Sequence, residues 1–349
     1  MEFRVHVALP QTDKKILPAD SFLFVGSCFA EHIGACMSDS GLDCLVNPFG
    51  VLYNPASIRN CLLLAAELSD ALPGSAGECS ACTDREQDYS GRLFFESGGI
   101  WHSWWNDSGF SRTNRTDCIA FFEQQYRLTG ARLKTASRIF ITLGTNHCYL
   151  LSDGMVVGNC HKQPARFFDE CVLSLEETTG ILRQIVLVCR KLNPQLQLVF
   201  TVSPYRYAKY GFHESQLGKA VLLLAVDEIC RAYADCCSYF PAYELLLDEL
   251  RDYRFYKEDM LHPSDQAVSY IWECFQQSYF ADETSQYTAE WSALKKALAH
   301  RPLHPESEAY HQFLCKTMLK IDTLQKKYPN LAIEKERARL AALLEQYSV

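Results

Sequence analysis

Ser27 and Cys28 are the residues whose types and position could supply a nucleophile. They follow a run of apolar residues and a glycine, at a point where a buried strand is predicted to turn directly into a helix. The start of a helix presents free backbone N–H groups and the positive end of the helix dipole, which favour an anion or a thiolate. The alternative is an ordinary strand–helix joint, in which Ser27 caps the helix and Cys28 is a small buried apolar side chain.

Asp259 and His262 could supply the general base that such a nucleophile requires. An aspartate three residues before a histidine can hold the imidazole from the same turn, as the third member of a catalytic triad does. The same spacing also arises by chance. Its meaning therefore depends on whether the fold brings His262 to Ser27 or Cys28.

Predicted strands and helices alternate along most of the chain. Apolar runs predict buried strands, and amphipathic segments between them predict helices, one of which covers residues 174–192 and begins with a capping box. Alternation at this spacing is typical of right-handed βαβ units, and hence of a parallel sheet flanked by helices. The predicted strands cover residues 22–25, 43–46, 138–143, 196–202 and 238–243.

Small and polar residues follow four of these strands. In a parallel sheet the carboxyl ends of the strands meet at one edge, where such sheets bind their ligands. We therefore expect these segments to lie together, with Asp259 and His262 completing the set. The segments are Gly26-Ser27-Cys28, Asn47 to Gly50, Gly144-Thr145-Asn146 and Ser203-Pro204-Tyr205-Arg206.

The order of these segments resembles that of the SGNH (GDSL-like) hydrolase superfamily. That superfamily has a nucleophile turn first, a glycine after the second strand, a Gly-x-Asn after the third and an Asp-x-x-His near the end. More narrowly, residues 26–30 read Gly-Ser-Cys-Phe-Ala, the motif that names the GSCFA family. The resemblance covers roughly residues 3–280 and includes Asn47-Pro48-Phe49-Gly50, Gly158-Asn159-Cys160-His161-Lys162, Ser203-Pro204-Tyr205-Arg206 and Asp252-Tyr253-Arg254-Phe255-Tyr256.

The resemblance implies an α/β fold with three layers, α/β/α. A five-stranded parallel sheet in the order 2-1-3-4-5 would lie between two layers of helices. This SGNH-like domain would cover residues 1–283, with an insertion or long loop over residues 72–115. Residues 284–349 would form a C-terminal helical appendage, whose amphipathic helices are predicted over 287–300, 306–328 and 334–346 and are a candidate surface for a homodimer.

The same resemblance implies an enzyme that hydrolyses an acyl ester or thioester, or transfers the acyl group. His262 would act as the general base, oriented by Asp259. The backbone N–H of Gly50 and the side chain of Asn146 would line the oxyanion hole. One preorganised donor of this kind typically contributes roughly 3–4 kcal/mol to stabilising the transition state.

The nucleophile turn departs from the pattern of the superfamily. The superfamily motif is Gly-Asp-Ser with the serine third, whereas Cys28 holds the third place here and Ser27 holds the place of the aspartate. In strict register the nucleophile is the Cys28 thiol, and the helix start together with His262 would lower its pKa. Ser27 is the alternative nucleophile if the turn is shifted by one residue.

Three further residues are candidates for binding the substrate. His161 lies in one of the motif segments, and Tyr205 and Arg206 follow a strand end, where they could hold a carboxylate or sugar hydroxyls. Their structural alternatives are a hydrogen-bonded loop histidine and a surface salt bridge. The expected substrate is an acylated carbohydrate or small metabolite. The alternative function is a non-catalytic relative that binds a glycan or an acylated small molecule.

Composition limits the classes of partner. Lysines and arginines total 34 against 42 aspartates and glutamates, and the net charge of −8 without long charged runs argues against a nucleic-acid surface. The first residues lack the apolar stretch of a signal peptide, and no apolar run approaches membrane-spanning length. The 16 cysteines lack the spacing of zinc ligands. We expect a cytoplasmic protein with free thiols, no membrane partner, and no metal or other cofactor.

Overall fold

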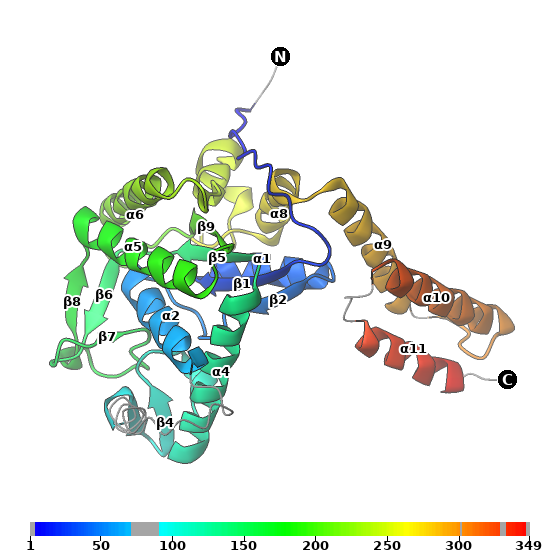
Figure 1. Cartoon of the computed structure of the whole chain (residues 1–349), viewed down its shortest axis with the longest axis horizontal. Coiled ribbons are helices and arrows are strands. Elements are labelled where there is room, and N and C mark those ends of the chain that lie inside the picture. Colours follow the sequence, from blue (N-terminus) through cyan, green and yellow to red (C-terminus); the bar gives the residue numbers. More distant parts are fainter. Residues whose placement is uncertain (1–3, 71–90, 301, 329–332, 347–349) are drawn as a thin grey trace. The chain divides into compact units, whose positions relative to one another are not determined.

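The structure is a computed structural model that describes residues 4–70, 91–300, 302–328 and 333–346 (Figure 1). The chain divides into two compact units. The first unit comprises residues 1–10, 22–34 and 45–271, and the second comprises residues 11–21, 35–44 and 272–349. The domain boundary that the sequence predicts between residues 283 and 284 stays a prediction.

Five parallel strands form the central sheet. Their spatial order is β2-β1-β5-β9-β10, which is 2-1-3-4-5 in chain order, so the predicted α/β fold and strand order are confirmed. The strands are β1 (Ser21–Gly26), β2 (Asp43–Val46), β5 (Arg138–Leu143), β9 (Gln197–Val202) and β10 (Cys237–Tyr239).

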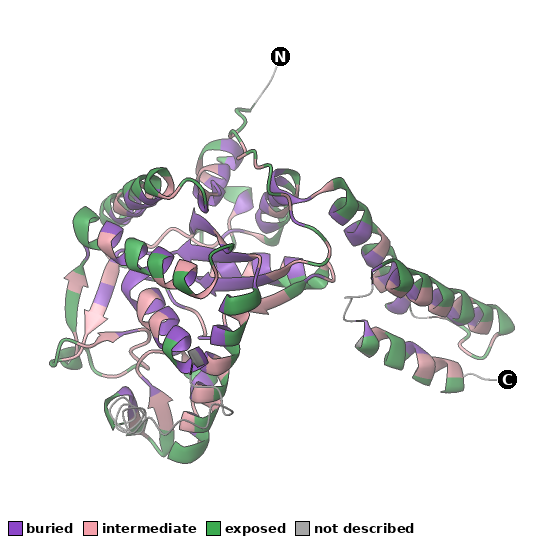
Figure 2. Ribbon diagram, viewed as in Figure 1, coloured by how far each residue is buried: buried purple, intermediate pink, exposed green. Residues whose placement is uncertain are grey.

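The three central strands of this sheet are buried on both faces (Figure 2). Strands of this kind form continuous apolar runs because helices cover both sides of the sheet. Leu23 and Val25 of β1 join the largest apolar cluster on one face. Phe24 points to the other face and stacks on Phe140 of β5, with ring centroids 4.5 Å apart.

Helices cover the two faces unequally. Four helices pack side by side over the face that Leu23 and Val25 share, in the order α4, α2, α5, α6. α1 (Cys28–Asp39) lies against the opposite face, where a Cβ on Gly34 would be 3.2 Å from the Phe24 ring. The four helices are α4 (Arg115–Thr135), α2 (Pro55–Asp70), α5 (Leu175–Leu192) and α6 (Phe212–Ala232).

The capping box predicted at the start of α5 is present. The Ser174 hydroxyl accepts a hydrogen bond from the N–H of Glu177 at 3.2 Å, and the Glu177 carboxylate accepts one from the N–H of Ser174 at 2.8 Å. Both donors would otherwise lack partners at a helix N-terminus.

The last strand is shorter than the sequence predicts. The prediction covers residues 238–243, but β10 ends at Tyr239. The N–H of Phe240 still donates to the carbonyl of Phe200 at 2.9 Å. Pro241 has no N–H to donate, and the short helix α7 (Ala242–Glu244) begins directly after it, so the chain leaves the sheet at the proline.

Two small antiparallel sheets that the sequence analysis does not predict stand outside the central sheet. One is a hairpin within the predicted insertion over residues 72–115; residues 71–90 of that insertion lie outside the described residues. The other has three strands in the order β7-β6-β8 and precedes α5. The strands are β3 (Phe94–Ser97), β4 (Ile100–Ser103), β6 (His147–Leu150), β7 (Val156–Val157) and β8 (Asp169–Val172).

In the second unit, residues 282–298, 308–327 and 334–346 form the predicted amphipathic helices. Their apolar sides are buried, as at Tyr310, Leu314 and Ile321 of α10. The hydroxyl of Tyr287 donates to the carbonyl of Gly41 at 2.7 Å within the same unit. A homodimer through these helices stays a prediction. After α8 (Asp265–Tyr279), the helices are α9 (Asp282–Leu298), α10 (Glu308–Lys327) and α11 (Glu334–Gln346).

Among the helices that the structure describes, none has both the length and the apolar composition required to cross a membrane. Every cysteine in the described residues is a free thiol. Cys79 and Cys82 lie outside the described residues.

The buried carboxylate of Glu249 holds the N-terminal segment of the first unit. Glu249 belongs to a π-helical segment over residues 245–250, and its side chain is 2% exposed. It accepts hydrogen bonds from the N–H of Val7 at 2.8 Å and from the Tyr270 hydroxyl, and lies 3.2 Å from Nδ1 of His6. Burial alone would raise the pKa of Glu249, but these partners together lower it below its ordinary value.

We expect Glu249→Gln to destabilise the folded chain by about 1–3 kcal/mol at neutral pH, because a charged acceptor becomes a neutral amide. The folded pKa lies below the unfolded one, so this contribution is complete above the unfolded pKa of about 4.3 and is lost as the pH falls through the folded value. The free energies of unfolding of the parent and of Glu249→Gln, measured with urea, should therefore converge in acid. Glu67→Gln, at an exposed site on α2, is the control, and a difference that stays constant with pH would contradict the role of the charge.

Candidate active site

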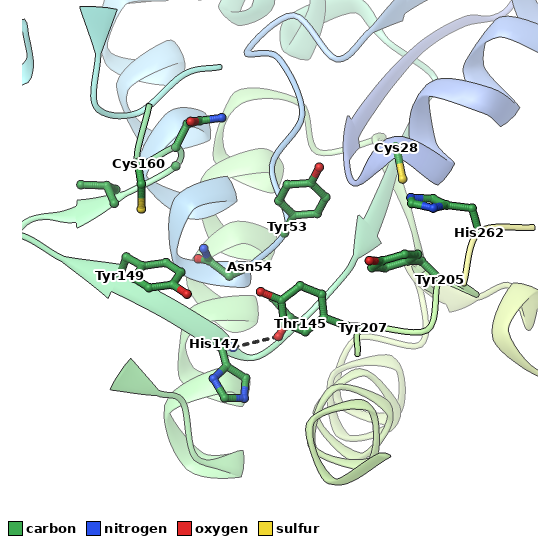
Figure 3. A pocket seen from close by; sticks show the side chains of 13 residues that line it. Cys28, Tyr53, Asn54, Thr145, His147, Tyr149, Cys160, Tyr205, Tyr207 and His262 are labelled. Atoms are coloured by element: carbon green, nitrogen blue, oxygen red, sulfur yellow. Dashed lines mark hydrogen bonds between the residues drawn. The ribbon is translucent and has the colours of Figure 1, made fainter. Parts of the chain in front are cut away.

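A cavity of about 360 Å³ lies at the carboxyl edge of the central sheet, within the first unit (Figure 3). The turns after β1 and β5 and the loop after β9 meet there. Aromatic and neutral polar side chains predominate, and no aspartate, glutamate, lysine or arginine is found among the described residues of its wall. The wall consists of Cys28, Tyr53, Asn54, Thr145, His147, Tyr149, Val157, Gly158, Asn159, Cys160, Tyr205, Tyr207 and His262.

Gly26 shapes the turn that presents Cys28. Its φ is +137°, and a Cβ at this position would lie 2.2 Å from the carbonyl oxygen of Thr142, so only glycine fits. The N–H of Gly26 donates to Oδ1 of Asn47 at 3.0 Å, which ties the end of β1 to the loop after β2. α1 then begins at Cys28 without an intervening loop.

Ser27 and Cys28 have different surroundings. Ser27 is 1% exposed, and its hydroxyl accepts a hydrogen bond from the N–H of Phe29 at 3.3 Å, as a capping side chain does. Cys28 lines the cavity, and Figure 3 shows its sulfur pointing toward the imidazole of His262. Of the two candidate nucleophiles, Cys28 is therefore the one that meets the histidine.

His262 reaches the cavity from a loop that Asp259 holds in shape. Nδ1 of His262 lies 2.5 Å from Oδ2 of Asp259, and Oδ1 accepts hydrogen bonds from the N–H groups of Leu261 and His262, both at 2.9 Å. The N–H of His262, followed by its ring, holds the pKa of the Asp259 carboxyl well below its ordinary value. Because Nδ1 faces the carboxylate, Nε2 is the atom that can accept a proton.

Backbone hydrogen bonds hold this loop beside the end of β9. The N–H of Arg206 donates to the carbonyl of Leu261 at 3.1 Å, and the N–H of Lys257 donates to the carbonyl of His262 at 2.8 Å. The ring of Tyr205 lies against that of His262, with centroids 4.3 Å apart. Tyr205 therefore lines the cavity and also limits where the His262 ring can move.

The pKa of the Cys28 thiol is raised, so the prediction that the helix start together with His262 gives it a lowered pKa is wrong. Burial is the largest cause and the carboxylate of Glu31 adds to it, because both disfavour a thiolate. The backbone N–H groups of Phe29 and Cys28 and the ammonium of Lys219 act in the opposite direction but are outweighed. Cys28 therefore needs a base to ionise at neutral pH.

Gly50 and Asn146, the predicted oxyanion-hole donors, are absent from the described wall of the cavity. The N–H of Gly50 donates to the carbonyl of Asn47 at 2.8 Å, in a turn where the φ of Gly50 is +75°. The side chain of Asn146 is buried and donates to the carbonyl of Leu173 at 2.9 Å. Both donors are engaged within the fold, so an oxyanion in this cavity needs other groups.

His161, a predicted substrate-binding residue, is part of an aromatic cluster instead of the cavity wall. Its Nε2 lies 2.8 Å from the carbonyl oxygen of Ser103. Its ring packs against the rings of His102 and Phe95, with centroids 4.6 Å and 5.6 Å away. These contacts match the structural alternative of a hydrogen-bonded loop histidine.

Arg206 also makes contacts other than those predicted. Its guanidinium lies over the ring of Phe212, 5.6 Å from the centroid, and the residue is not in the described cavity wall. A side chain can leave a pocket in this way although its neighbour Tyr205 stays in it, because successive side chains of an extended segment point to opposite sides.

Most of the cavity wall was not predicted from the sequence. Tyr53 and Asn54 directly precede α2. An asparagine before a proline is a sequence signal for the start of a helix, and Oδ1 of Asn54 does cap α2 by accepting a hydrogen bond from the N–H of Ser57 at 2.8 Å. Tyr149 comes from β6, and Cys160 comes from the loop after β7. Tyr149 thus belongs to the small antiparallel sheet, which was not predicted from the sequence, and Cys160 belongs to the connection between its strands β7 and β8.

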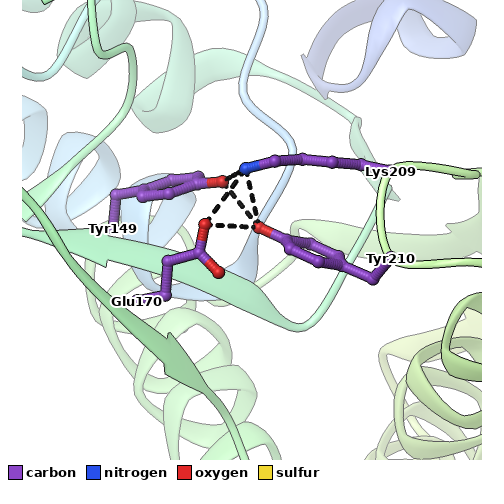
Figure 4. Close-up of polar contacts among 4 residues, drawn as sticks. All are labelled: Tyr149, Glu170, Lys209 and Tyr210. Atoms are coloured by element: carbon purple, nitrogen blue, oxygen red, sulfur yellow. Dashed lines mark hydrogen bonds and ion pairs between the residues drawn. The ribbon is translucent and has the colours of Figure 1, made fainter. Parts of the chain in front are cut away.

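A polar cluster fastens the loop after β9 to this small sheet (Figure 4). Nζ of Lys209 lies 3.0 Å from Oε1 of Glu170 and 2.9 Å from the hydroxyl of Tyr210, and it also donates to the hydroxyl of Tyr149. The hydroxyls of Tyr149 and Tyr210 are 2.6 Å apart. Since Tyr149 lines the cavity, this cluster holds the wall opposite Cys28.

The described part of the chain contains no set of three or more His, Cys, Asp or Glu side chains arranged to hold a metal ion. The two histidines of the wall have aromatic neighbours, since His147 stacks on Tyr210 with centroids 4.1 Å apart. What the arrangement can do chemically is remove a proton from the Cys28 thiol with His262.

A family model described as the GSCFA family matches residues 21–275. The chain belongs to the GSCFA family. The matched range contains the whole cavity wall together with Asp259, so the GSCFA resemblance seen in the sequence is confirmed. A second model, described as GSCFA domain protein, C-terminal domain, matches residues 291–346, a range that includes the end of α9 and the whole of α10 and α11. None of the curated proteins searched matches this GSCFA chain.

In this GSCFA protein we expect the Asp259 carboxyl to titrate well below the ordinary aspartate value of about 3.9, because N–H donors stabilise its charged form. Carbon NMR of labelled aspartate measures the midpoint, and Asp259→Asn identifies the signal. His262→Ala should raise the midpoint only in part, since the backbone donors at positions 261 and 262 remain. A midpoint at the ordinary value in the parent protein would contradict the Asp259–His262 pair.

Proposed function

We propose that this GSCFA protein is an SGNH-like acyl hydrolase or acyltransferase that acts on an ester or thioester with Cys28 as its nucleophile. His262 would be the general base, and Asp259 would orient it. The observation that carries the proposal is the meeting of the Cys28 sulfur with an imidazole held by a carboxylate, at one end of a neutral cavity.

In the proposed reaction, Nε2 of His262 takes the proton of the Cys28 thiol while the sulfur attacks the carbonyl carbon of the acyl group. His262 returns the proton to the leaving oxygen or sulfur as the tetrahedral intermediate collapses, and a thioester remains on Cys28. Water or a second acceptor, deprotonated by His262, then attacks this thioester and releases the acyl group. Asp259 stabilises the imidazolium that forms in both halves of the reaction.

The oxyanion donors are assigned to groups at the same end of the cavity as Cys28. The N–H groups of Cys28 and Phe29 already act on the sulfur, since they favour its thiolate. The hydroxyl of Tyr53 points toward the Cys28 end of the cavity in Figure 3. The N–H of Cys28 and the Tyr53 hydroxyl therefore replace Gly50 and Asn146 in the proposed mechanism.

The cavity wall favours a small neutral substrate that carries hydroxyl groups. Its volume of about 360 Å³ is at the lower end for ligand sites. Flat aromatic rings pack on the apolar faces of a sugar ring, and side-chain hydroxyls and amides bond its hydroxyls. We therefore propose an acylated carbohydrate or a similar small metabolite. The groups that would bind it are Tyr53, Tyr149, Tyr205, Tyr207, Asn54 and Asn159.

Two observations favour a second candidate function, the binding of a glycan or acylated molecule without turnover. Burial raises the pKa of Cys28, and the donors expected for an oxyanion, Gly50 and Asn146, are engaged elsewhere. A binding protein would need the cavity and its tyrosines but no ionised thiol.

We expect Cys28→Ala to abolish hydrolysis of short-chain p-nitrophenyl esters and acyl thioesters, because it removes the attacking atom. Cys28→Ser should keep a small fraction of the rate, since a hydroxyl in the same place is a weaker nucleophile. Ser27→Ala is the matched control: loss of the helix cap should cost about 1 kcal/mol of stability and leave kcat/KM largely unchanged.

Calorimetric titration with the same compounds separates the two candidate functions. If the parent protein binds these compounds saturably without turning them over, and Cys28→Ala binds them equally well, the enzyme proposal is contradicted and the binding function is supported. Turnover that survives Cys28→Ala but is lost in Ser27→Ala would make Ser27 the nucleophile.

A further inference from the structure

Lys219 of α6 is a buried cation that has no carboxylate partner in the described part of the chain. The residue is 2% exposed. Its Nζ donates to the carbonyl oxygens of Gly144 and Ser203, both at 2.7 Å. A buried unpaired charge is strongly unfavourable unless dipoles or an anion compensate it. The two carbonyl dipoles compensate only part of it, and no carboxylate supplies the rest.

These two carbonyls belong to the segments that build the cavity. Gly144 directly follows β5, and Ser203 directly follows β9. Thr145 and Tyr205, one and two residues further along, line the cavity. Because one ammonium bonds both strand ends, Lys219 holds the two segments at a constant separation.

The charge of Lys219 also acts on Cys28. The ammonium favours the Cys28 thiolate, and the thiolate in turn favours the protonated lysine. Burial lowers the pKa of Lys219 to about 7, and the guanidinium of Arg206 acts in the same direction. The ammonium is therefore lost as the pH rises through about 7, unless an anion forms near it.

Other titratable groups face Lys219 from every neighbouring element. Most of them border the same small internal gap as the lysine, and the ring of Tyr243 lies 5.7 Å from its Nζ. The charge states of these groups contribute to the electrostatic potential at Lys219. They are Cys28 on α1, His147 on β6, Arg206, Tyr207 and Tyr210 after β9, Glu214 on α6 and Tyr243 on α7.

We propose that Lys219 is a positioning residue of the site, whose ammonium holds the ends of β5 and β9 and is the counter-charge for the anion that forms at Cys28. The inference deepens the proposed function and rests on it for its catalytic consequence. An ammonium near the thiolate offsets part of the cost of its burial, and the thiolate adds an anion near a lysine that forms no ion pair among the described residues. This mutual stabilisation exists only while both groups are charged.

The test is the rate at which iodoacetamide alkylates Cys28, followed by mass spectrometry of the peptide that contains it. At about pH 6 we expect Lys219→Met to slow this alkylation roughly tenfold, the effect of an upward shift of about one unit in the thiol pKa. At about pH 9 the lysine of the parent is largely neutral, so the two rates should agree within about twofold. Lys219→Arg keeps the charge and should retain most of the parent rate in acid.

Lys134→Met is the matched control, because Nζ of Lys134 also donates to a backbone carbonyl, that of Ser69 at 2.9 Å, and the residue does not line the cavity. It should leave the alkylation of Cys28 unchanged. Equal slowing by Lys219→Met at both pH values would reduce Lys219 to a structural support and overturn the proposal. Unchanged rates at both pH values would overturn it as well.

Arg206→Gln keeps the proposal testable if Lys219→Met does not fold. Removing the guanidinium should raise the pKa of Lys219, so fast alkylation of Cys28 should extend to higher pH than in the parent. An unshifted profile would count against the coupling of Lys219 to Cys28.

Turnover of p-nitrophenyl esters, measured in parallel, separates this inference from the proposed function. Turnover is expected to fall in Lys219→Met together with the rate of alkylation. If the parent has no turnover, the enzyme proposal fails, while the alkylation profile still decides the role of Lys219. If an active parent shows the same alkylation profile as Lys219→Met, only the role of Lys219 fails.

Discussion

Parallel pairing of β1, β5 and β9 determines where the candidate site can form. Gly26 stands opposite Thr142, and Leu143 stands opposite Val202, so the three strands end at about the same level. The segments that follow them therefore meet at one edge and bring Cys28, Thr145 and Tyr205 to one cavity. A slip of one residue in either pairing would exchange the side chains that pack on the two faces of the sheet and break contacts such as the stacking of Phe24 on Phe140.

The ionisable groups of the site are stabilised in pairs. Burial disfavours the thiolate of Cys28 and the ammonium of Lys219, and each group favours the charged form of the other. The Asp259 carboxylate is half-exposed and held by N–H donors, so it stays ionised and keeps the His262 ring oriented. This division of roles suits acyl transfer, in which a proton must move between a buried thiol and an oriented base.

The walls of the cavity depend on contacts of a different kind. Tyr149, from the small antiparallel sheet, bonds the loop after β9 through Lys209 and Tyr210. Exposed polar pairs of this sort contribute little stability one by one, whereas β1, β5 and β9 of the central sheet are buried along nearly their whole length. The strands β1, β5 and β9 that end at the cavity thus belong to the buried sheet, whereas Asp259, His262 and the tyrosines of the wall stand on loops or on the small antiparallel sheet.

The sequence by itself determined the α/β fold, the strand order implied by its resemblance and the capping box of α5, and it proposed His262 beside Ser27 or Cys28 without deciding between the two. Apolar periodicity, glycine and proline positions and cap residues are local signals, because each affects the backbone within a few residues of its own position. Gly26 is a clear case, because only glycine can adopt its φ so close to the carbonyl of Thr142.

Only the tertiary structure decided which polar groups face the cavity and which are used inside the fold. Asn146 is a donor in an expected segment, yet the carbonyl of Leu173, 27 residues further along the chain, accepts from it. The raised pKa of Cys28 likewise follows from burial by segments distant in the chain, which outweighs the helix start that the sequence reveals. Hydrogen-bond partners and desolvation are set by atoms brought together across long stretches of chain, and local patterns do not contain them.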